Sequence, residues 1–151
     1  MKRTLTALTV AATMFASSVS AFDPDELQKL LDTNECERCD LTGAMIVQAN
    51  LQGANLWDSD LADAVLAYAF LHSANLAYAN LERVHLKMAS LDGANLRGAN
   101  LVDAYLAGAN LVDVNLTGAD LTGAYLARAS LRGAILCNTI MPDGSVIYSG
   151  C

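Results

Sequence analysis

The sequence lacks the motifs by which most enzymes and membrane proteins are identified. It has no Gly-x-Ser-x-Gly, no glycine-rich phosphate loop and no His-Glu-x-x-His, and His72 and His85 lie outside any cluster of metal-ligating residues. No uninterrupted apolar run approaches the roughly 18–20 residues that a membrane helix needs. We therefore predict a protein that is not an enzyme, holds no cofactor or metal, and does not insert into a membrane once its N-terminal segment is removed.

That N-terminal segment has the layout of a signal peptide. Met1-Lys2-Arg3 supplies a positive start, an apolar stretch follows, and Val19-Ser20-Ala21 places small residues at a cleavage site. We predict that residues 1–21 are a signal peptide cleaved after Ala21, although a retained anchor is the alternative. The mature protein is then expected to be periplasmic or secreted, in a bacterium.

Basic residues are scarce. The chain has 9 Lys and Arg against 16 Asp and Glu, a net charge of −7. Removal of Lys2 and Arg3 leaves 7 basic residues, and 7 minus 16 gives −9 for the mature chain. Nucleic-acid binding needs Lys and Arg to displace counterions from phosphates, so this balance disfavours nucleic acid as a partner.

The sequence has instead a period of five residues. From Leu41 to Leu136 every fifth residue is leucine, with Ile46 the one exception in twenty positions. Two residues earlier stands alanine in sixteen of the twenty cases, and the residue between is most often Asn or Asp. Neither an α-helix nor a straight strand keeps such leucines on one face. The chain must therefore turn once per repeat, with alanine and leucine both pointing inward.

The tandem pattern Ala-(Asn/Asp)-Leu-x-x over residues 39–138 resembles the pentapeptide-repeat family. The resemblance implies an all-β fold, a right-handed quadrilateral β-helix with four repeats in each coil. Twenty repeats then make about five coils, roughly 24 Å long at the ~4.8 Å spacing of paired strands. The five-residue period excludes a coiled coil, and the regular leucines disfavour a disordered low-complexity tract.

The ends of such a solenoid need caps, because they expose unpaired backbone and apolar interior. At the N-terminal end, Asp23 has the character of an N-cap before Pro24 and Glu26. We predict a helix from Pro24 to about Thr33, with Leu27, Leu30 and Leu31 on one face, so that residues 22–38 form a capping helix and linker. At the other end, a turn signal at residues 141–144 precedes β-prone residues, and we predict that residues 139–151 form a capping hairpin.

Four cysteines lie in pairs near the two ends of the repeats, and cysteines in an exported chain favour disulfides. On the implied rod the two pairs are ~24 Å apart, whereas bonded cysteines have Cα atoms within about 7 Å. Cys137–Cys151 and Cys36–Cys39 are then the possible intramolecular bonds. The first would staple the hairpin. For Cys36 and Cys39 the alternatives of a buried free thiol, a redox motif and half of a zinc site stay open.

If residues twenty apart stack, as the family fold implies, the outer surface divides into four faces. One face forms an acidic ridge made of Asp40, Asp60, Asp63, Glu82, Asp103 and Asp120. Another carries a ladder of Asn55, Asn75, Asn95 and Asn115, which we assign to stability because amide ladders support stacked strands.

A third face carries apolar and aromatic residues where Asn or Asp usually stands. We call this surface, together with neighbouring side chains, the aromatic strip; it consists of Met45, Val65, Tyr68, Phe70, His85, Met88, Tyr105 and Tyr125. Exposed patches of this kind often mark contact surfaces. The alternative is that Tyr105 and Tyr125 only pack on each other between coils.

Three functions fit these observations. The first is a non-catalytic module of the cell envelope that binds an unknown protein partner, or a second copy of itself, through the aromatic strip. The second is a mimic of DNA that binds a topoisomerase, as some family members do; the acidic ridge favours it, and the signal peptide and the short, uninterrupted repeat run oppose it. The third is a solenoid that binds a small ligand or a glycan. We prefer the first.

Overall fold

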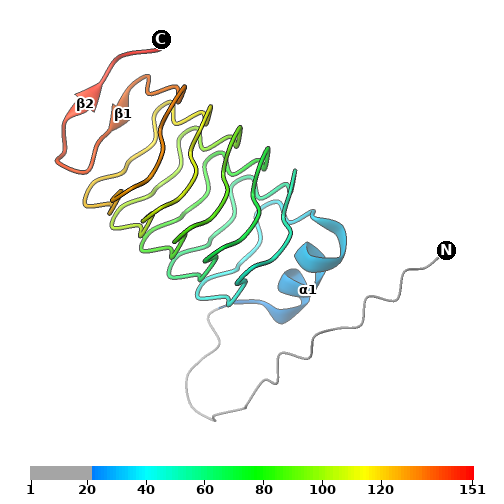
Figure 1. Cartoon of the computed structure of the whole chain (residues 1–151). Helices are drawn as coiled ribbons and strands as arrows, with labels where there is room; N and C mark the ends of the chain where they lie inside the picture. Colours follow the sequence, from blue (N-terminus) through cyan, green and yellow to red (C-terminus); the bar gives the residue numbers. More distant parts are fainter. Residues whose placement is uncertain (1–21) are drawn as a thin grey trace.

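The structure, a computed structural model, describes residues 22–151, so the predicted signal peptide lies outside the described range. Within that range the helices and strands are helix α1 (Pro24–Thr33) and the short strands β1 (Thr139–Ile140) and β2 (Val146–Ile147). Between α1 and β1 the chain winds as a stack of coils, drawn from cyan to orange in Figure 1. Among the described residues, no helix has the length and apolar character needed to cross a bilayer.

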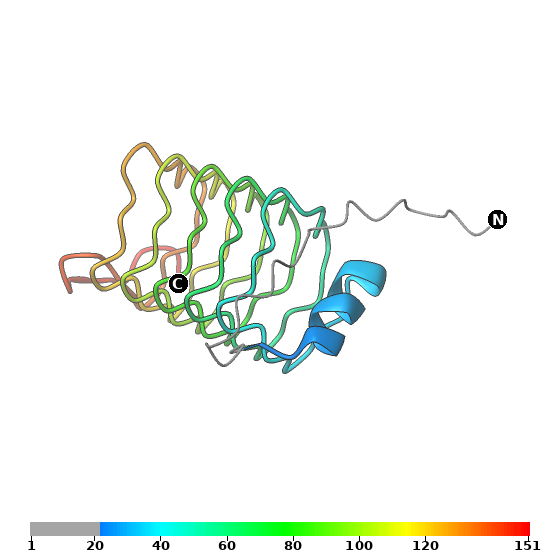
Figure 2. The same cartoon turned by 90° about the horizontal axis from the view of Figure 1, so that it is seen from below.

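Residues twenty apart in the sequence lie side by side on successive coils. Isolated parallel bridges form four ladders, which begin at Glu35, Asp40, Met45 and Asn50 and continue in steps of twenty. The hydrogen bonds run in both directions across each step. The Leu41 amide donates to the Asp60 carbonyl at 2.8 Å, and the Asp60 amide donates to the Cys39 carbonyl at 2.9 Å. Figure 2 shows the stack from the side, and its twenty-residue period equals four pentapeptides.

Each pentapeptide bends the chain once. The Ala44 amide donates to the Leu41 carbonyl at 3.0 Å, and this four-residue turn recurs along the coils. The third residue of the turn has a positive φ, as a type II turn requires; Gly43, for example, has a φ of 71°. Glycine is the residue best suited to that position, yet Tyr68 and Met88 also occupy it with φ of 60° and 56°.

The interior is a column of leucine and alanine, as the five-residue period predicts. Every repeat leucine from Leu41 to Leu121 is buried, and most of the repeat alanines beside them are buried too. A small residue next to a large one is what a narrow solenoid interior can pack. Towards the last coil Leu126, Leu131 and Leu136 are only partly buried, because no further coil covers them.

Helix α1 is present over the residues for which a helix was predicted, and it lies at the first coil (Figure 1). The Asp23 carboxylate caps it, accepting from the amides of Asp25 at 2.9 Å and Glu26 at 3.4 Å. Glu26 ties the helix to the coil, since its carboxylate accepts from the Asp40 amide at 2.5 Å. Leu30 is fully buried against the repeats.

One residue of the predicted apolar face of this helix was placed wrongly. Leu31 is 47% exposed rather than packed on the solenoid. It follows Leu30 directly, and successive residues of an α-helix point about 100° apart. With Leu30 directed into the core, Leu31 therefore points away from it.

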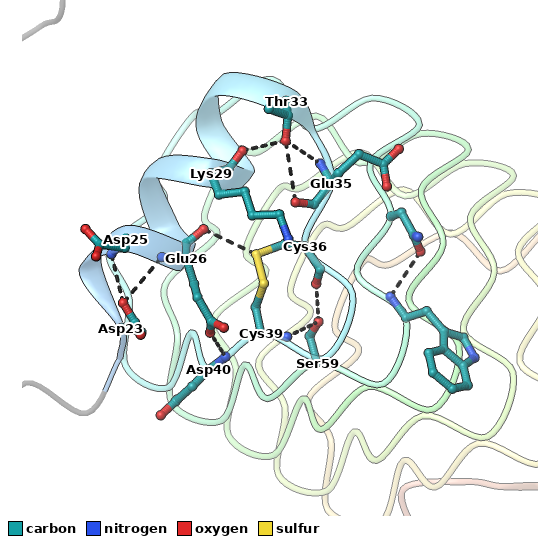
Figure 3. Close-up of a disulfide and its surroundings, with 12 residues drawn as sticks. Asp23, Asp25, Glu26, Lys29, Thr33, Glu35, Cys36, Cys39, Asp40 and Ser59 are labelled. Carbon is teal, nitrogen blue, oxygen red and sulfur yellow. Dashed lines mark hydrogen bonds between the residues drawn. A yellow bond between two sulfur atoms is a disulfide. The ribbon is translucent and has the colours of Figure 1, made fainter.

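Cys36 and Cys39 form a buried disulfide between α1 and the first coil, with Cα atoms 5.4 Å apart (Figure 3). The sequence left this pairing open, and the disulfide excludes the alternative of a buried free thiol at these two cysteines. Cys36 Sγ also lies 3.2 Å from the Glu26 carbonyl oxygen; a bonded sulfur carries no proton, so this is a contact and not a hydrogen bond. Beside it the Ser59 hydroxyl donates to the Cys36 carbonyl at 2.5 Å and accepts from the Cys39 amide at 3.2 Å.

The C-terminal residues form the predicted hairpin. Strands β1 and β2 pair antiparallel, with Thr139 opposite Ile147. In the connecting turn Asp143 accepts from the Ser145 hydroxyl and amide, and these hydrogen bonds hold the pKa of its carboxyl below the usual value. The predicted bond between Cys137 and Cys151 is present, with Cα atoms 4.9 Å apart.

Candidate interaction surface

The core of the aromatic strip is a single ladder of the solenoid. Parallel bridges join Met45 to Val65, Val65 to His85, His85 to Tyr105 and Tyr105 to Tyr125. Because residues paired in register on parallel strands point the same way, all five side chains project from one face. Their rings are in contact: the Tyr105 and Tyr125 centroids are 5.2 Å apart with planes at 14°, and those of His85 and Tyr105 are 6.0 Å apart.

These side chains remain open to solvent although they stack. Tyr105 is 36% exposed, Tyr125 is 52% exposed, and Met45 is 64% exposed. The stacking between coils that the sequence left as an alternative is therefore real. It orders the two tyrosines without covering their edges, so the strip is a pre-arranged aromatic surface on the outside of the rod.

Tyr68 and Met88 form a second row beside this ladder, at the third position of their turns. Both are about half exposed, and both have the positive φ that disfavours side chains with a Cβ. A left-handed conformation costs an ordinary residue roughly 1–2 kcal/mol. The same turn position carries other non-glycine residues elsewhere on the coils, such as Tyr78, Arg83 and Asp103.

Phe70 lies on the adjacent face rather than on the strip itself. Its bridges join it to Asn50 and Ser90, and it is 50% exposed. The structure therefore places seven of the eight predicted strip residues on one face, in two neighbouring rows, and one around the corner.

A shallow hollow of about 310 Å³ opens in the strip between the last coils. Its floor includes Gly108, an ideal Cβ on which would collide with the Met88 sulfur. The two stacked tyrosine rings and two basic side chains take part in the lining, which includes Lys87, Met88, Tyr105, Gly108, Tyr125 and Arg128. Lys87 and Arg128 were not part of the predicted strip.

The charge of this face differs from the rest of the molecule. None of the pentapeptides that form it, residues 44–48, 64–68, 84–88, 104–108 and 124–128, contains Asp or Glu. Within residues 22–151 neither Lys87 nor Arg128 has a carboxylate within ion-pair distance, since the ion pairs there involve Arg38 and Arg83. The absence of Asp and Glu from these pentapeptides can be read from the sequence, and it was the signal that could have drawn attention to Lys87 and Arg128.

The acidic ridge on the neighbouring face is partly neutralised. Arg83 donates to both carboxylate oxygens of Asp63 at 2.8 Å and also pairs with Glu82. The hydrogen bond from Arg83 lowers the pKa of the Asp63 carboxyl, and the same partner raises the pKa of the Arg83 guanidinium. Asp60 accepts from the Asn80 amide group at 3.0 Å, so a carboxylate of the ridge also takes part in the side-chain hydrogen bonds between successive coils.

The asparagine ladder has the hydrogen bonds that its stabilising role requires. The Asn75 amide group donates to Asn55 Oδ1 at 3.3 Å, and that of Asn95 donates to Asn75 Oδ1 at 3.2 Å. The same oxygens also accept from backbone amides two residues on, as from Ala77 at 3.3 Å. Across the described part of the chain, no three His, Cys, Asp or Glu side chains gather as a metal site would need.

Comparisons with known proteins agree on the family. The profile described as pentapeptide repeats matches eight copies, at residues 35–58, 58–89, 89–126 and 99–138. A pentapeptide repeat protein from the Arabidopsis thaliana thylakoid lumen is 26% identical, with a TM-score of 0.53, and the aligned region covers 65% of each chain. No curated protein sequence gives a significant match.

Two cyanobacterial structures are also similar. Rfr23 from Cyanothece 51142 is 32% identical over 73% of this chain and 92% of its own, with a TM-score of 0.49. HetL from Nostoc sp. PCC 7120, involved in heterocyst differentiation regulation, is 33% identical over 75% of this chain and 66% of its own, with a TM-score of 0.38.

The matched segments run without a break from residue 35 to residue 138, and the ladders begin at Glu35. Cys36 occupies the place of the repeat leucine there and is buried like one. Proteins of the family are right-handed quadrilateral β-helices, generally structural or interaction proteins, and the matches point to no catalytic family. The sequence period, the twenty-residue ladders and these matches together show that the chain belongs to the pentapeptide-repeat family.

Proposed function

We propose that the protein is a non-catalytic, exported module of the cell envelope that binds a protein partner through the aromatic strip. One observation carries this proposal: ordered and exposed aromatic rings stack as one continuous ladder on a single face of the rod. Aromatic side chains are enriched where proteins contact each other, because they bury a large area at little cost in side-chain entropy.

The second row of the strip supports the same conclusion. Tyr68 and Met88 each leave about half of their surface open to solvent beside the stacked rings. Met88 lies over Gly108 of the next coil, so this row extends the exposed apolar surface to the hollow. A contact surface that uses both rows would bury more apolar area than one that uses the ladder alone.

Export is supported by three observations. Residues 1–21 have the layout of a signal peptide, and the mature chain contains two disulfides. Structural disulfides persist in oxidising compartments and are rare in the cytosol. The similar Arabidopsis protein is a protein of the thylakoid lumen. We infer a periplasmic or secreted bacterial protein.

The finer form of the fold belongs to the proposal as well. We infer a right-handed β-helix of about five coils, with α1 as its N-terminal cap and the β1–β2 hairpin as its C-terminal cap. The Asp23 amide donates to the Asp40 carbonyl at 3.0 Å, and the Leu121 amide donates to the Ile140 carbonyl at 2.8 Å. Both segments thus pair with coil backbone that would otherwise be open.

A second candidate, the DNA mimic, rests on the acidic ridge. Its carboxylates do lie on one face, but asparagines separate Asp60 from Asp120 in the ladder and Arg83 neutralises part of the ridge. Two disulfides also favour a compartment without DNA topoisomerases. These features place the DNA mimic second.

The proposal is tested in two steps. The intact mass of the protein expressed with its own leader should begin at Phe22, and reduction should raise it by about 4 Da for two disulfides. Tagged protein should then co-purify a discrete partner from an envelope extract, and Tyr105→Ser/Tyr125→Ser should lose it. A full-length reduced chain would refute export, and unchanged recovery by the double variant would refute the role of the strip.

A further inference from the structure

The hollow in the strip points to the chemistry of the partner. We propose that it recognises an acidic, extended polypeptide segment, whose carboxylates pair with Lys87 and Arg128 while its apolar side chains lie against Met88 and Tyr105. This inference rests on the proposed function, because it specifies what kind of protein segment the strip would bind.

The two cations are free to take part. Within the described chain Arg83 is held by Asp63 and Glu82, and Arg38 by Asp58, but no carboxylate reaches Lys87 or Arg128. Both line the same hollow as Tyr105 and Tyr125, and their turns lie two coils apart on the same edge of the ladder. A carboxylate placed there would form charge-assisted hydrogen bonds, which are about twice as strong as neutral ones.

Charge complementarity selects an acidic occupant. The mature chain carries −9, and the acidic ridge would repel an acidic segment that approached the neighbouring face. The strip pentapeptides contribute no carboxylate of their own and contribute Lys87, Arg128 and His85. Like-charge contacts suppress wrong docking, and the strip pentapeptides offer an acidic segment only neutral or basic side chains.

The solenoid backbone determines how such a segment can bind. The amides of Tyr68, Met88 and Gly108 already donate to carbonyls of the next coil at 2.9 Å. The segment therefore cannot add as a further β-strand on this face and must be held by side chains. Met45 and Tyr125 are four coil steps apart, about 19 Å at ~4.8 Å per step, which an extended segment of roughly six residues covers.

The test uses defined peptides and the full mature protein labelled with ¹⁵N. A peptide of Glu-Glu-Tyr repeats should shift the amide signals of Lys87, Tyr105 and Arg128, and added salt should weaken the binding. A peptide of Lys-Lys-Tyr repeats should bind at least about tenfold more weakly, because its charge is reversed. The double variant Lys87→Gln/Arg128→Gln should bind the acidic peptide about tenfold more weakly.

The matched control is Arg97→Gln/Arg132→Gln, which removes two unpaired, exposed cations from other faces and should leave binding unchanged. Equal binding of the two peptides, shifts confined to other faces, or equal losses in both double variants would overturn the inference. If the acidic peptide fails to bind while Tyr105→Ser/Tyr125→Ser still loses the native partner, the proposed function stands and only the acidic segment is wrong.

Discussion

The Met88 side chain lies over Gly108, the residue that occupies the same turn position one coil further on. An ideal Cβ on Gly108 would collide with the Met88 sulfur, so a side chain at residue 108 would move Met88 within the hollow that Tyr105 and Tyr125 also line. The shape of the candidate site thus depends on one missing side chain.

Gly108→Ala should therefore destabilise the protein and also change the shape of the hollow. The positive φ of 67° costs alanine about 1 kcal/mol, and displacement of Met88 adds to that loss. Gly118→Ala is the matched control, with a φ of 69° and no atom within 4 Å of the added Cβ. Urea unfolding should show a similar backbone cost for both variants. Titration with the Glu-Glu-Tyr peptide should show loss of binding only for Gly108→Ala. Equal binding by both would show that the hollow is not used.

Tyr68→Gly should stabilise the protein while it weakens partner binding. Relief of the left-handed conformation outweighs the added freedom of glycine in the unfolded chain, for a gain of about 0.5–1 kcal/mol. Tyr78→Gly is the comparison, because Tyr78 has a φ of 61° but packs edge-on against Trp57 at 6.5 Å between ring centroids. Loss of the contact with Trp57 should cancel the stability that Tyr78→Gly gains from relief of the backbone. A stability loss for Tyr68→Gly would mean that its side chain has a structural role.

Ser59→Ala should cost about 1–3 kcal/mol, although alanine is the usual residue of its column. The Ser59 hydroxyl satisfies the Cys36 carbonyl and the Cys39 amide, and the alanine variant leaves both buried without partners. Ser130→Ala, at an exposed position, should change the free energy of unfolding by less than about 0.5 kcal/mol. Equal midpoints for the two variants in urea would contradict this reading of the first coil.

Cys137→Ser/Cys151→Ser should loosen the C-terminal hairpin more than the coils. The bond closes a loop with a sequence separation of 14, for which loop-closure entropy predicts up to about 3 kcal/mol. The Leu121 and Gly123 amides donate to the Ile140 and Pro142 carbonyls, so their hydrogen exchange should accelerate. The Leu61 amide, bonded to Asn80 in mid-solenoid, is the internal reference. Faster exchange of Leu61 to the same degree would show that the hairpin is not an independent unit.

Much of this fold could be predicted from the sequence because its rules are local and repeated. The leucine period predicts the inward column, and the N-cap at Asp23 predicts where α1 begins. The prediction that Leu31 packs on the solenoid was wrong. The docked helix directs Leu30 into the core, and Leu31 points about 100° away from it. The Cys36–Cys39 bond stayed open because it depends on the turn between them, where Arg38 has a φ of 58°.

The candidate site could be predicted only in part. Its ladder, from Met45 to Tyr125, follows from the twenty-residue period, but Phe70 lies around a corner. Lys87 and Arg128 could not be placed beside Tyr105 from spacing alone, because their side chains extend from turn positions in directions set by neighbouring coils. The hollow depends on the contact between Met88 and Gly108, which is a property of packing and not of the repeat pattern.

The most direct test of the central claim is site-specific photocrosslinking in the organism that makes the protein. Benzoylphenylalanine in place of Tyr125 should give a discrete adduct with an envelope protein, whereas the same group in place of Arg97, exposed on the opposite face, should give none. An adduct at twice the mass of the mature chain would identify the partner as a second copy. Adducts from position 97 alone, or equally from both positions, would contradict the claim that the aromatic strip is the binding surface.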